Sequence, residues 1–469
     1  MAIGWKLHGD GRSLAPGEVV RPDERLSWGK TAGIGAQHVV AMFGATFVFP
    51  VVMGLDPNLA IMMSGIATIL FLLIVNGKVP SYLGTSASFV GAVASIRAAG
   101  GSTGNVTGAI LVAGLVLLVV GVIIHVLGAG IIHRIFPPVV TGAVVMLIGF
   151  NLAPVVANVY WPQDQWVALA TLAFVVLCSV LLRGFWSRIA VLLGLVFGYG
   201  LSWVLDHTSG KITAVDGAGK MSTHHRVNFD GVKAADWFGF PHLHGPDFKT
   251  SAILVALPAV IALIAENTGH VKAVAAMTET NLDPYLGRAL AADGIGTVLA
   301  SAVGGSPTTT YAENIGVMAA TRIYSTAAYF VAAIVAVLFG LCPKFGALVA
   351  ATPGGVLGGI TVVLYGMIGL LGAKIWIENR VDFGNPVNLV PVAAGIILAI
   401  GNVNLQITKD FPLQGIALGT VVVLAGYHLL AAAQRTPGDG GGVIAAGESD
   451  TVTGTVADAP SGPAREGAE

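Results

Sequence analysis

Long apolar blocks recur along the whole chain and constrain its fold more than any other feature. Each is close to the roughly 20 mostly apolar residues that a membrane-spanning helix needs, and fourteen can be counted. They cover residues 32–52, 58–76, 81–97, 107–129, 138–156, 165–182, 186–205, 251–271, 286–304, 307–320, 325–342, 355–373, 386–402 and 413–432. Asp, Glu, Lys and Arg make up only 10% of the chain, against roughly 25% in soluble domains. The pattern predicts an all-α polytopic membrane protein and excludes a soluble enzyme or a nucleic-acid-binding protein.

The distribution of Lys and Arg predicts the orientation in the membrane. With the N-terminus in the cytoplasm and the segments alternating, 16 of the 24 basic residues fall on the cytoplasmic side. Five of the other eight lie in the long loop 206–250, where the positive-inside rule is weaker. We therefore expect a plasma-membrane (inner-membrane) protein with both termini cytoplasmic. No signal peptide is expected in residues 1–30, and the Gly-, Ala- and Asp-rich tail 433–469 is predicted to be disordered.

An internal repeat relates the two halves of the chain. The sequence LDPNL at 55–59 matches LDPYL at 282–286, which begins 227 residues later, and Pro80 and Pro307 are separated by the same interval. Seven segments separate equivalent positions, and because seven is odd the halves must be inserted upside down. The sequence therefore predicts the 7+7 inverted repeats of secondary transporters.

Segments three and ten, at 81–97 and 307–320, differ from the others. Both are short, follow or open with proline, and are rich in Ser, Thr and Gly. Irregular backbone at membrane depth is tolerated where it faces a cavity, and paired broken helices commonly frame a binding site near the midplane. We expect the binding site between these two segments.

Three acidic residues, Glu266, Asp293 and Glu313, fall well inside apolar segments. Acidic residues at membrane depth are costly and are functional candidates by default. His270 lies four residues after Glu266, so the two share one helix face. Asp293 stands among small residues, and the pattern leaves open whether it has a functional or a structural role.

The chemistry of these positions favours a particular class of ligand. No Lys or Arg lies deep in any segment, and two carboxylates would repel an anion. They suit a cation or a neutral ligand with N–H donors, since charge-assisted hydrogen bonds are strong and directional. Small planar molecules with alternating N–H and C=O groups, such as nucleobases, have this property.

Several motifs make the chain resemble the nucleobase–ascorbate transporter family, also called nucleobase–cation symporter-2, over residues 30–432. The family signature is matched in segment ten, and further matches lie in segments one, three and eight. The residues that carry the resemblance are Glu313, Asn314, Gly316, Thr321 and Arg322 of the signature, Gln37-His38, Tyr82-Leu83-Gly84-Thr85-Ser86, and Glu266 with His270.

Within that family, the chain looks most like the uracil and pyrimidine permease branch, which has Glu at the first signature position. Two positions depart from the pattern, since Ala87 replaces a common Phe and Ala312 replaces a common Gly. Alanine keeps the backbone N–H donor but removes aromatic area, which enlarges the expected pocket. A xanthine or purine permease of the same family therefore remains an alternative.

The resemblance also implies a division into domains. A core domain would comprise 31–130 and 251–343, and a gate domain would comprise 131–205 and 344–432. The segment 1–30 would be a cytoplasmic N-terminal tail and 206–250 an external loop. The resemblance further implies proton symport, contact with membrane lipid and possible homodimers. A proton would be the coupling ion, with no cofactor, metal or nucleic-acid partner.

The expected roles of individual residues follow from the same resemblance. Substrate binding is assigned to Glu266, Glu313, Ala87, Ala312, Ser86 and Tyr365, the last from the gate domain. Proton coupling is assigned to His270, His38, Tyr311 and Glu266, and Gln37, Asn314, Gly316, Thr321 and Arg322 support the signature. The prediction is a proton-coupled importer of uracil or a related pyrimidine. A passive nucleobase channel is the alternative from another class, and no nucleophile–base pair or metal-ligand set indicates an enzyme.

Overall fold

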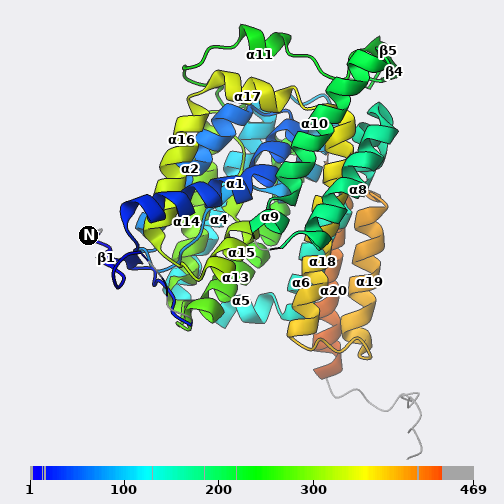
Figure 1. Cartoon of the computed structure of the whole chain (residues 1–469). Coiled ribbons are helices and arrows are strands. Elements are labelled where there is room, and N and C mark those ends of the chain that lie inside the picture. Colours follow the sequence, from blue (N-terminus) through cyan, green and yellow to red (C-terminus); the bar gives the residue numbers. More distant parts are fainter. Residues whose placement is uncertain are drawn as a thin grey trace, which may run out of the picture.

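The computed structural model describes residues 4–12, 14, 17–128, 130–183, 185–217, 219–408 and 411–435 of the 469-residue chain. Helices dominate and pack into one body (Figure 1). Among the described residues, eight helices are long and apolar enough to cross a membrane, or nine if α16 and α17, which meet at 83°, form one span. The predicted helical architecture is confirmed, and the full set of fourteen spans stays a prediction.

The first half of the chain runs from the N-terminal strands to the end of α10. Its elements in order are β1 (Lys6–Leu7), β2 (Glu24–Arg25), α1 (Trp28–Met53), α2 (Pro57–Ile74), β3 (Leu83–Thr85), the 3₁₀ turn η1 (Ala87–Phe89), α3 (Val90–Ala98), α4 (Thr103–Leu127), α5 (Gly130–Ile135), α6 (Pro138–Phe150), α7 (Ala153–Val155), the π-helical turn η2 (Val156–Tyr160), η3 (Trp161–Gln163), α8 (Gln165–Leu181), α9 (Phe185–Arg188) and α10 (Ala190–Thr208).

The second half begins with the hairpin that follows α10. Its elements are β4 (Ile212–Val215), β5 (Met221–His224), α11 (Asp230–Ala234), α12 (Thr250–Ala256), α13 (Ala259–Thr278), α14 (Asp283–Ala302), β6 (Thr308–Thr310), α15 (Ala312–Thr321), α16 (Thr326–Gly340), α17 (Pro343–Ala350), α18 (Gly354–Glu378), α19 (Pro386–Ile400), β7 (Asn404–Thr408), β8 (Phe411–Gln414) and α20 (Gly415–Arg435).

Local sequence explains where several helices begin. Asp56 accepts hydrogen bonds from the backbone N–H groups of Asn58 and Leu59 and so caps α2, whose first residue is a proline. Ser102 and Asn105 form a reciprocal capping box at the start of α4, with both bonds at 3.1 Å. These caps satisfy N–H groups that the first helical turn leaves without intrahelical partners.

The long helices form two sets of close neighbours. In one set α4 packs on α14, and α2 packs on α16 and α14. In the other set α18 packs on α6 and α8, and α19 packs on α20 (Figure 1). The division of the chain into core and gate domains stays a prediction.

Two short buried strands meet inside the first set of helices. β3 and β6 pair antiparallel, with Gly84 opposite Thr309. The pairing satisfies backbone polar groups that would otherwise be exposed at membrane depth. β3 leads into η1 and α3, and β6 leads into α15, so two helix N-termini begin beside the strand pair. These are the two stretches in which the sequence predicts irregular backbone, although their assignment as broken membrane segments stays a prediction.

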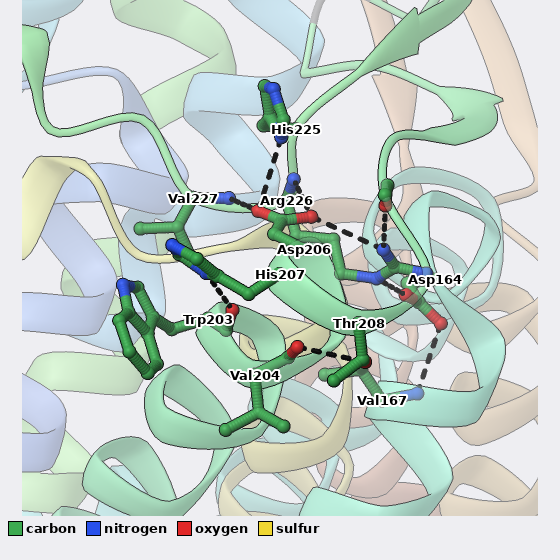
Figure 2. A network of polar contacts seen from close by, with 11 residues as sticks. Asp164, Val167, Trp203, Val204, Asp206, His207, Thr208, His225, Arg226 and Val227 are labelled. Carbon is green, nitrogen blue, oxygen red and sulfur yellow. Dashed lines mark hydrogen bonds and ion pairs between the residues drawn. The ribbon is translucent and has the colours of Figure 1, made fainter.

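The segment 206–250 is more ordered than a simple solvated loop. It contains the β4–β5 hairpin and α11, which lie at one end of the molecule, whereas α20 ends at the other (Figure 1). Arg226 anchors the segment by binding Asp164, Asp206 and the carbonyl of Gly210 (Figure 2). The aromatic side chains of Trp237, Phe238 and Phe240 are highly exposed.

Residues 1–30, predicted as a tail, pack onto the helical body over most of their described part. β1 and β2 pair in parallel, and Val20, which is fully buried, forms a bridge with Ile323 just beyond α15. The indole Nε1 of Trp5 donates to Thr326 Oγ1 at 2.8 Å. At the other terminus, residues 433–435 end α20, and the predicted disorder of 436–469 concerns residues outside those described.

Candidate substrate-binding site

A cavity of about 420 Å³, here called the central cavity, lies where β3, β6 and the starts of η1 and α15 face α6, α13 and α18. It brings together residues that the sequence places more than 200 positions apart. Its lining includes Phe49, Thr85, Ala87, Ser88, Glu266, His270, Thr309, Thr310, Tyr311, Ala312, Glu313, Ile315, Gly316, Ile368, Lys374 and Glu378. Six of the predicted substrate-binding and proton-coupling residues therefore share one cavity. These are Glu266, Glu313, Ala87, Ala312, His270 and Tyr311.

Glu266 projects from the middle of α13 into this cavity. Its Oε2 accepts a hydrogen bond from Ser88 Oγ at 3.4 Å, which is long and weak. The contact ties the carboxylate to η1, on the opposite wall of the site. Because Glu266 lines the cavity, its carboxylate can also accept an N–H group of a ligand.

Glu313 lies in the first turn of α15, which begins deep inside the protein at Ala312. Although Glu313 lies deep in the protein, its side chain is accessible to solvent because it borders two internal cavities. The N-terminus of a helix carries partial positive charge, which favours an anionic side chain there. The site therefore has two carboxylates held by different helices around one space.

His270 and Tyr311 are fixed by hydrogen bonds to the strand pair. His270 Nδ1 and Thr310 Oγ1 are 2.8 Å apart. The Tyr311 hydroxyl donates to the carbonyl of Thr85 at 2.8 Å, and its backbone N–H donates to the carbonyl of Tyr82 at 3.0 Å. Tyr311 thus joins the end of β6 to β3, and its ring packs directly against the backbone of Gly84.

Backbone donors border the same cavity. Ala87 and Ala312 are the first residues of η1 and α15, and N–H groups at such positions lack intrahelical partners. Ser86 lies just outside the cavity lining. Its Oγ accepts from the N–H of Ser88 at 3.2 Å, and its own N–H donates to the carbonyl of Pro307. Its observed contacts therefore position η1.

Gln37 and His38 of α1 do not line the central cavity, although Phe49 near the end of the same helix does. His38 is fully buried, and Asn314 Nδ2 donates to its carbonyl at 3.1 Å and contacts its Nδ1 at 3.2 Å. The His38 ring also packs on Tyr329, with centroids 4.3 Å apart. Gln37 is half-buried on the same helix. These contacts link α1 to α15, so His38 is separated from the cavity by α15.

Asp293, whose role the sequence left open, is fully buried on α14. Its Oδ2 accepts from Asn267 Nδ2 at 3.0 Å. Asn267 follows Glu266 directly on α13, so the bond fixes the helix that carries the cavity carboxylate. The bond therefore gives Asp293 a structural role, as a link between α13 and α14.

Of the signature residues, Gly316 lines the cavity one turn after Glu313, whereas Thr321 and Arg322 end α15. Thr321 Oγ1 donates to the carbonyl of Val317 at 2.9 Å, and Arg322 adopts a left-handed conformation with φ of 57°.

Tyr365 stacks on Phe49 with ring centroids 6.2 Å apart. It lines a neighbouring cavity of about 450 Å³ between α6 and α18, and its stacking partner lines the central cavity.

Several lining residues were missed by the sequence reasoning. Ser88 binds Glu266 and Thr310 binds His270, and both lie in the Ser- and Thr-rich stretches that follow Pro80 and Pro307. Those stretches were a usable signal for hydroxyl groups near the site. Lys374 and Glu378 also line the cavity, and their charged atoms are 3.6 Å apart on the last turns of α18. The sequence around them contains no feature that indicates a place in the site. Among the described residues, no group of three or more His, Cys, Asp or Glu side chains could hold a metal ion.

Comparison with known proteins identifies the family of this chain. A family model described as the permease family matches residues 29–408, a range that includes every lining residue of the central cavity. The chain belongs to this family. It is therefore a transporter of the nucleobase–ascorbate group that the signature residues indicated, and an integral multi-pass membrane protein.

Individual relatives extend over most of the chain. A putative pyrimidine permease, RutG of Escherichia coli K12, is 46% identical over 86% of this chain and 90% of its own length. The uracil permease of Escherichia coli K12 is 36% identical over 84% and 89%, and that of Bacillus subtilis 168 is 34% identical over 85% and 91%. These proteins are permeases, and the chain is not an enzyme.

Solved structures support the fold at much lower identity. The transmembrane domain of the cyanobacterial bicarbonate transporter BicA matches with a TM-score of 0.57 and 16% identity, over 85% of this chain and 96% of that chain. Murine Slc26a9, an anion transporter in the inward-facing state, matches with a TM-score of 0.62 and 11% identity, over 90% and 70%. At such identity the likeness concerns the fold alone.

Proposed function

We propose that this permease imports uracil or a closely related pyrimidine base together with protons. The observation that carries the proposal is the central cavity, which places the carboxylates of Glu266 and Glu313 around one space bordered by the helix starts at Ala87 and Ala312. Carboxylates accept ring N–H groups and backbone N–H groups donate to ring carbonyls. Uracil presents both kinds of group on one small planar ring.

The relatives support the choice of substrate. RutG is named a putative pyrimidine permease, and the Escherichia coli and Bacillus subtilis relatives are named uracil permeases. Among the described residues that line the central cavity, the one Lys or Arg is Lys374, which pairs with Glu378 on α18. A neutral N–H-bearing base therefore fits better than an anion.

Alternating access is proposed on a frame of fourteen segments in two inverted halves. The LDP motifs of the two halves both begin helices, α2 after Asp56 and α14 at Asp283. The antiparallel pairing of β3 with β6 supports the opposite orientation of the halves. Both termini would be cytoplasmic, the membrane would be the plasma membrane, and the core and gate domains would move relative to each other.

The cavity would face the cytoplasm in this conformation. Its lining extends to Lys374 and Glu378 at the end of α18 opposite the β4–β5 hairpin (Figure 1). At the other side, Phe49 stacks against Tyr365 and separates the central cavity from the space between α6 and α18. Glu266, His270 and Tyr311 would carry the proton, with His38 acting through Asn314. A homodimer is compatible with this frame.

Uptake of labelled uracil by proteoliposomes that contain the purified protein tests the proposal. Accumulation should require an inward proton gradient, rise as external pH falls and vanish with a protonophore. Thymine and uracil should compete more strongly than xanthine or ascorbate. Accumulation that persists after the proton gradient has collapsed, in the absence of sodium, would refute proton coupling. Flux that only equilibrates uracil would instead support a passive channel.

A further inference from the structure

A second cavity, here called the apolar cavity, adjoins the central cavity on the other side of Glu313. It has a volume of about 350 Å³. It lies between α1 and α15 on one side and the end of α8, α9, the start of α10 and the middle of α18 on the other. Glu313 and Gly316 belong to the linings of both cavities. The two spaces therefore meet at one face of α15.

Gly316 leaves open space beside the boundary between the two cavities. A Cβ atom built at this glycine would have no heavy atom within 4 Å, apart from its own chain neighbours and helix backbone. Glu313 and Gly316 are three residues apart and so lie on the same helix face. A ligand held at Glu313 can therefore extend past Gly316 without displacing a side chain.

The chemistry of the apolar cavity differs from that of the central cavity. Val40 from α1 and Val363, Leu364 and Met367 from α18 give it a mainly hydrocarbon wall. Apart from Glu313, its polar side chains are two serines, and Ser179 already donates to the carbonyl of Val175 at 2.8 Å. Ordered water needs two to four polar partners, so this space suits an apolar group better than water.

We propose that the apolar cavity is an accessory subsite that accepts an alkyl or aryl substituent of a base held at Glu313. This inference rests on the proposed function, since it needs a pyrimidine in the central cavity. The ligands in question are uracils substituted at C6. The two cavities share Glu313 and Gly316 in their linings. The group that occupies the apolar cavity is therefore a substituent of the same ligand whose ring lies in the central cavity.

Ring geometry selects the C6 position. Uracil has two ring N–H groups, and the one at N3 lies between two carbonyls and so has no substituted carbon beside it. The N–H at N1 is flanked by C6. When Glu313 accepts the N1 proton, a C6 group lies beside the carboxylate and points past it, whereas a C5 group lies one ring position further away. The subsite therefore distinguishes 6-alkyl from 5-alkyl isomers.

Equilibrium binding to the purified full-length protein tests the inference, with uracil, 6-methyluracil, 6-propyluracil and 5-propyluracil as probes. Burial of apolar surface should make each added carbon at C6 improve affinity by about fourfold. The 5-propyl isomer should bind no better than uracil. If 6-propyluracil binds more weakly than uracil, or no better than its 5-propyl isomer, the subsite does not exist.

Two variants on adjacent residues of α18 provide a matched comparison. Val363→Phe fills the apolar cavity, whereas Val362→Phe points into the separate space between α6 and α18. Val363→Phe should keep uracil affinity and reduce 6-propyluracil affinity at least tenfold, and Val362→Phe should change neither. Equal 6-propyluracil affinity in the two variants would overturn the proposal.

Two further controls keep the results interpretable. Ala41→Leu fills the same cavity from α1 and should reproduce the selective loss if Val363→Phe does not fold. Unchanged 6-propyluracil affinity in Ala41→Leu would likewise overturn the proposal. Failure of the parent protein to bind uracil itself would overturn the proposed function, and the subsite with it. Normal uracil binding without any preference for C6 substituents would overturn the subsite alone.

Discussion

The guanidinium of Arg226 donates from Nε to Asp164 Oδ2 at 2.8 Å and joins the segment after β5 to the start of α8 (Figure 2). Its Nη1 donates to Asp206 Oδ1 at 3.3 Å, on the last turn of α10. Asp164 also caps α8 by accepting from Trp166 and Val167. One cation therefore holds two helix ends and the segment after β5 together.

Arg226→Ala should lower the free energy of unfolding by about 3 kcal/mol, because removing one member of a buried ion pair leaves the other unpaired. The three side chains are 12%, 8% and 5% exposed for Arg226, Asp164 and Asp206. Lys233→Ala is the control, since Lys233 and Asp230 are 3.8 Å apart and almost fully solvated. Thermal unfolding in detergent measures both. Equal melting temperatures would show that the Arg226 contacts do not stabilise the protein.

Glu313→Gln should weaken uracil binding at least tenfold while expression stays normal. The substitution keeps the size of the side chain but replaces a carboxylate by a group that also presents N–H, and a hydrogen bond to a charged group contributes about 1.5–3 kcal/mol. Glu279→Gln, at an exposed position after α13, is the matched control. Binding of labelled uracil to purified protein gives the comparison. Unchanged affinity for Glu313→Gln would remove this residue from the site.

Gly84→Ala should disrupt the site through Tyr311. A Cβ at position 84 would lie 2.7 Å from Tyr311 Oη and closer still to its ring, so the ring must move away from Thr85. Uracil affinity should fall at least tenfold. Gly200→Ala, on α10 with nothing within 4 Å of the new Cβ, should leave binding intact and gain up to about 1 kcal/mol of stability. Wild-type affinity in Gly84→Ala would mean that Tyr311 does not hold the binding geometry.

Ala87→Phe tests whether this position sets the width of the pocket. Ala87 lines the central cavity at the start of η1, so a phenyl ring there would add aromatic contact in a roomy space. Overfilling a packed site typically costs about 1–3 kcal/mol. We expect the variant to keep uracil, whose contact with the backbone N–H is unchanged, and to lose competition by thymine and xanthine. An identical competition profile in the two proteins would show that Ala87 does not limit the pocket.

Packing of the N-terminal segment should depend on pH. Burial acts to raise the pKa of Glu24, but hydrogen bonds from the Arg21 N–H and from His8 outweigh it and hold that pKa below its ordinary value of 4.5. The resulting stability is present above pH 4.5 and is lost as pH falls through the lowered pKa. Protection of residues 4–12 against hydrogen exchange, measured relative to the intrinsic exchange rate at each pH, should therefore fall at acid pH. In Glu24→Gln, exchange should be faster at neutral pH and should lose this dependence, and retention of the dependence would assign it to another group.

Sequence alone determined the class of protein and several residues of the central cavity. Apolar length dictated membrane-spanning helices, because a bilayer excludes unsatisfied backbone polar groups. The cost of acidic groups at membrane depth singled out Glu266 and Glu313, and the prolines marked the stretches that form β3 and β6 beside them. These predictions rest on local physical costs that each residue carries wherever the chain folds.

Only the tertiary structure decided which side chains share a space. It placed His38 behind α15 on Asn314 and Tyr365 beside a different cavity. It added Ser88 and Thr310 to the site, and it joined the apolar cavity to the central cavity at Gly316. It also gave Arg226, which the sequence marked only as one charge in an external loop, two buried partners. Each of these results depends on contacts between segments far apart in the chain, whose geometry is set by the packing of whole helices rather than by local composition.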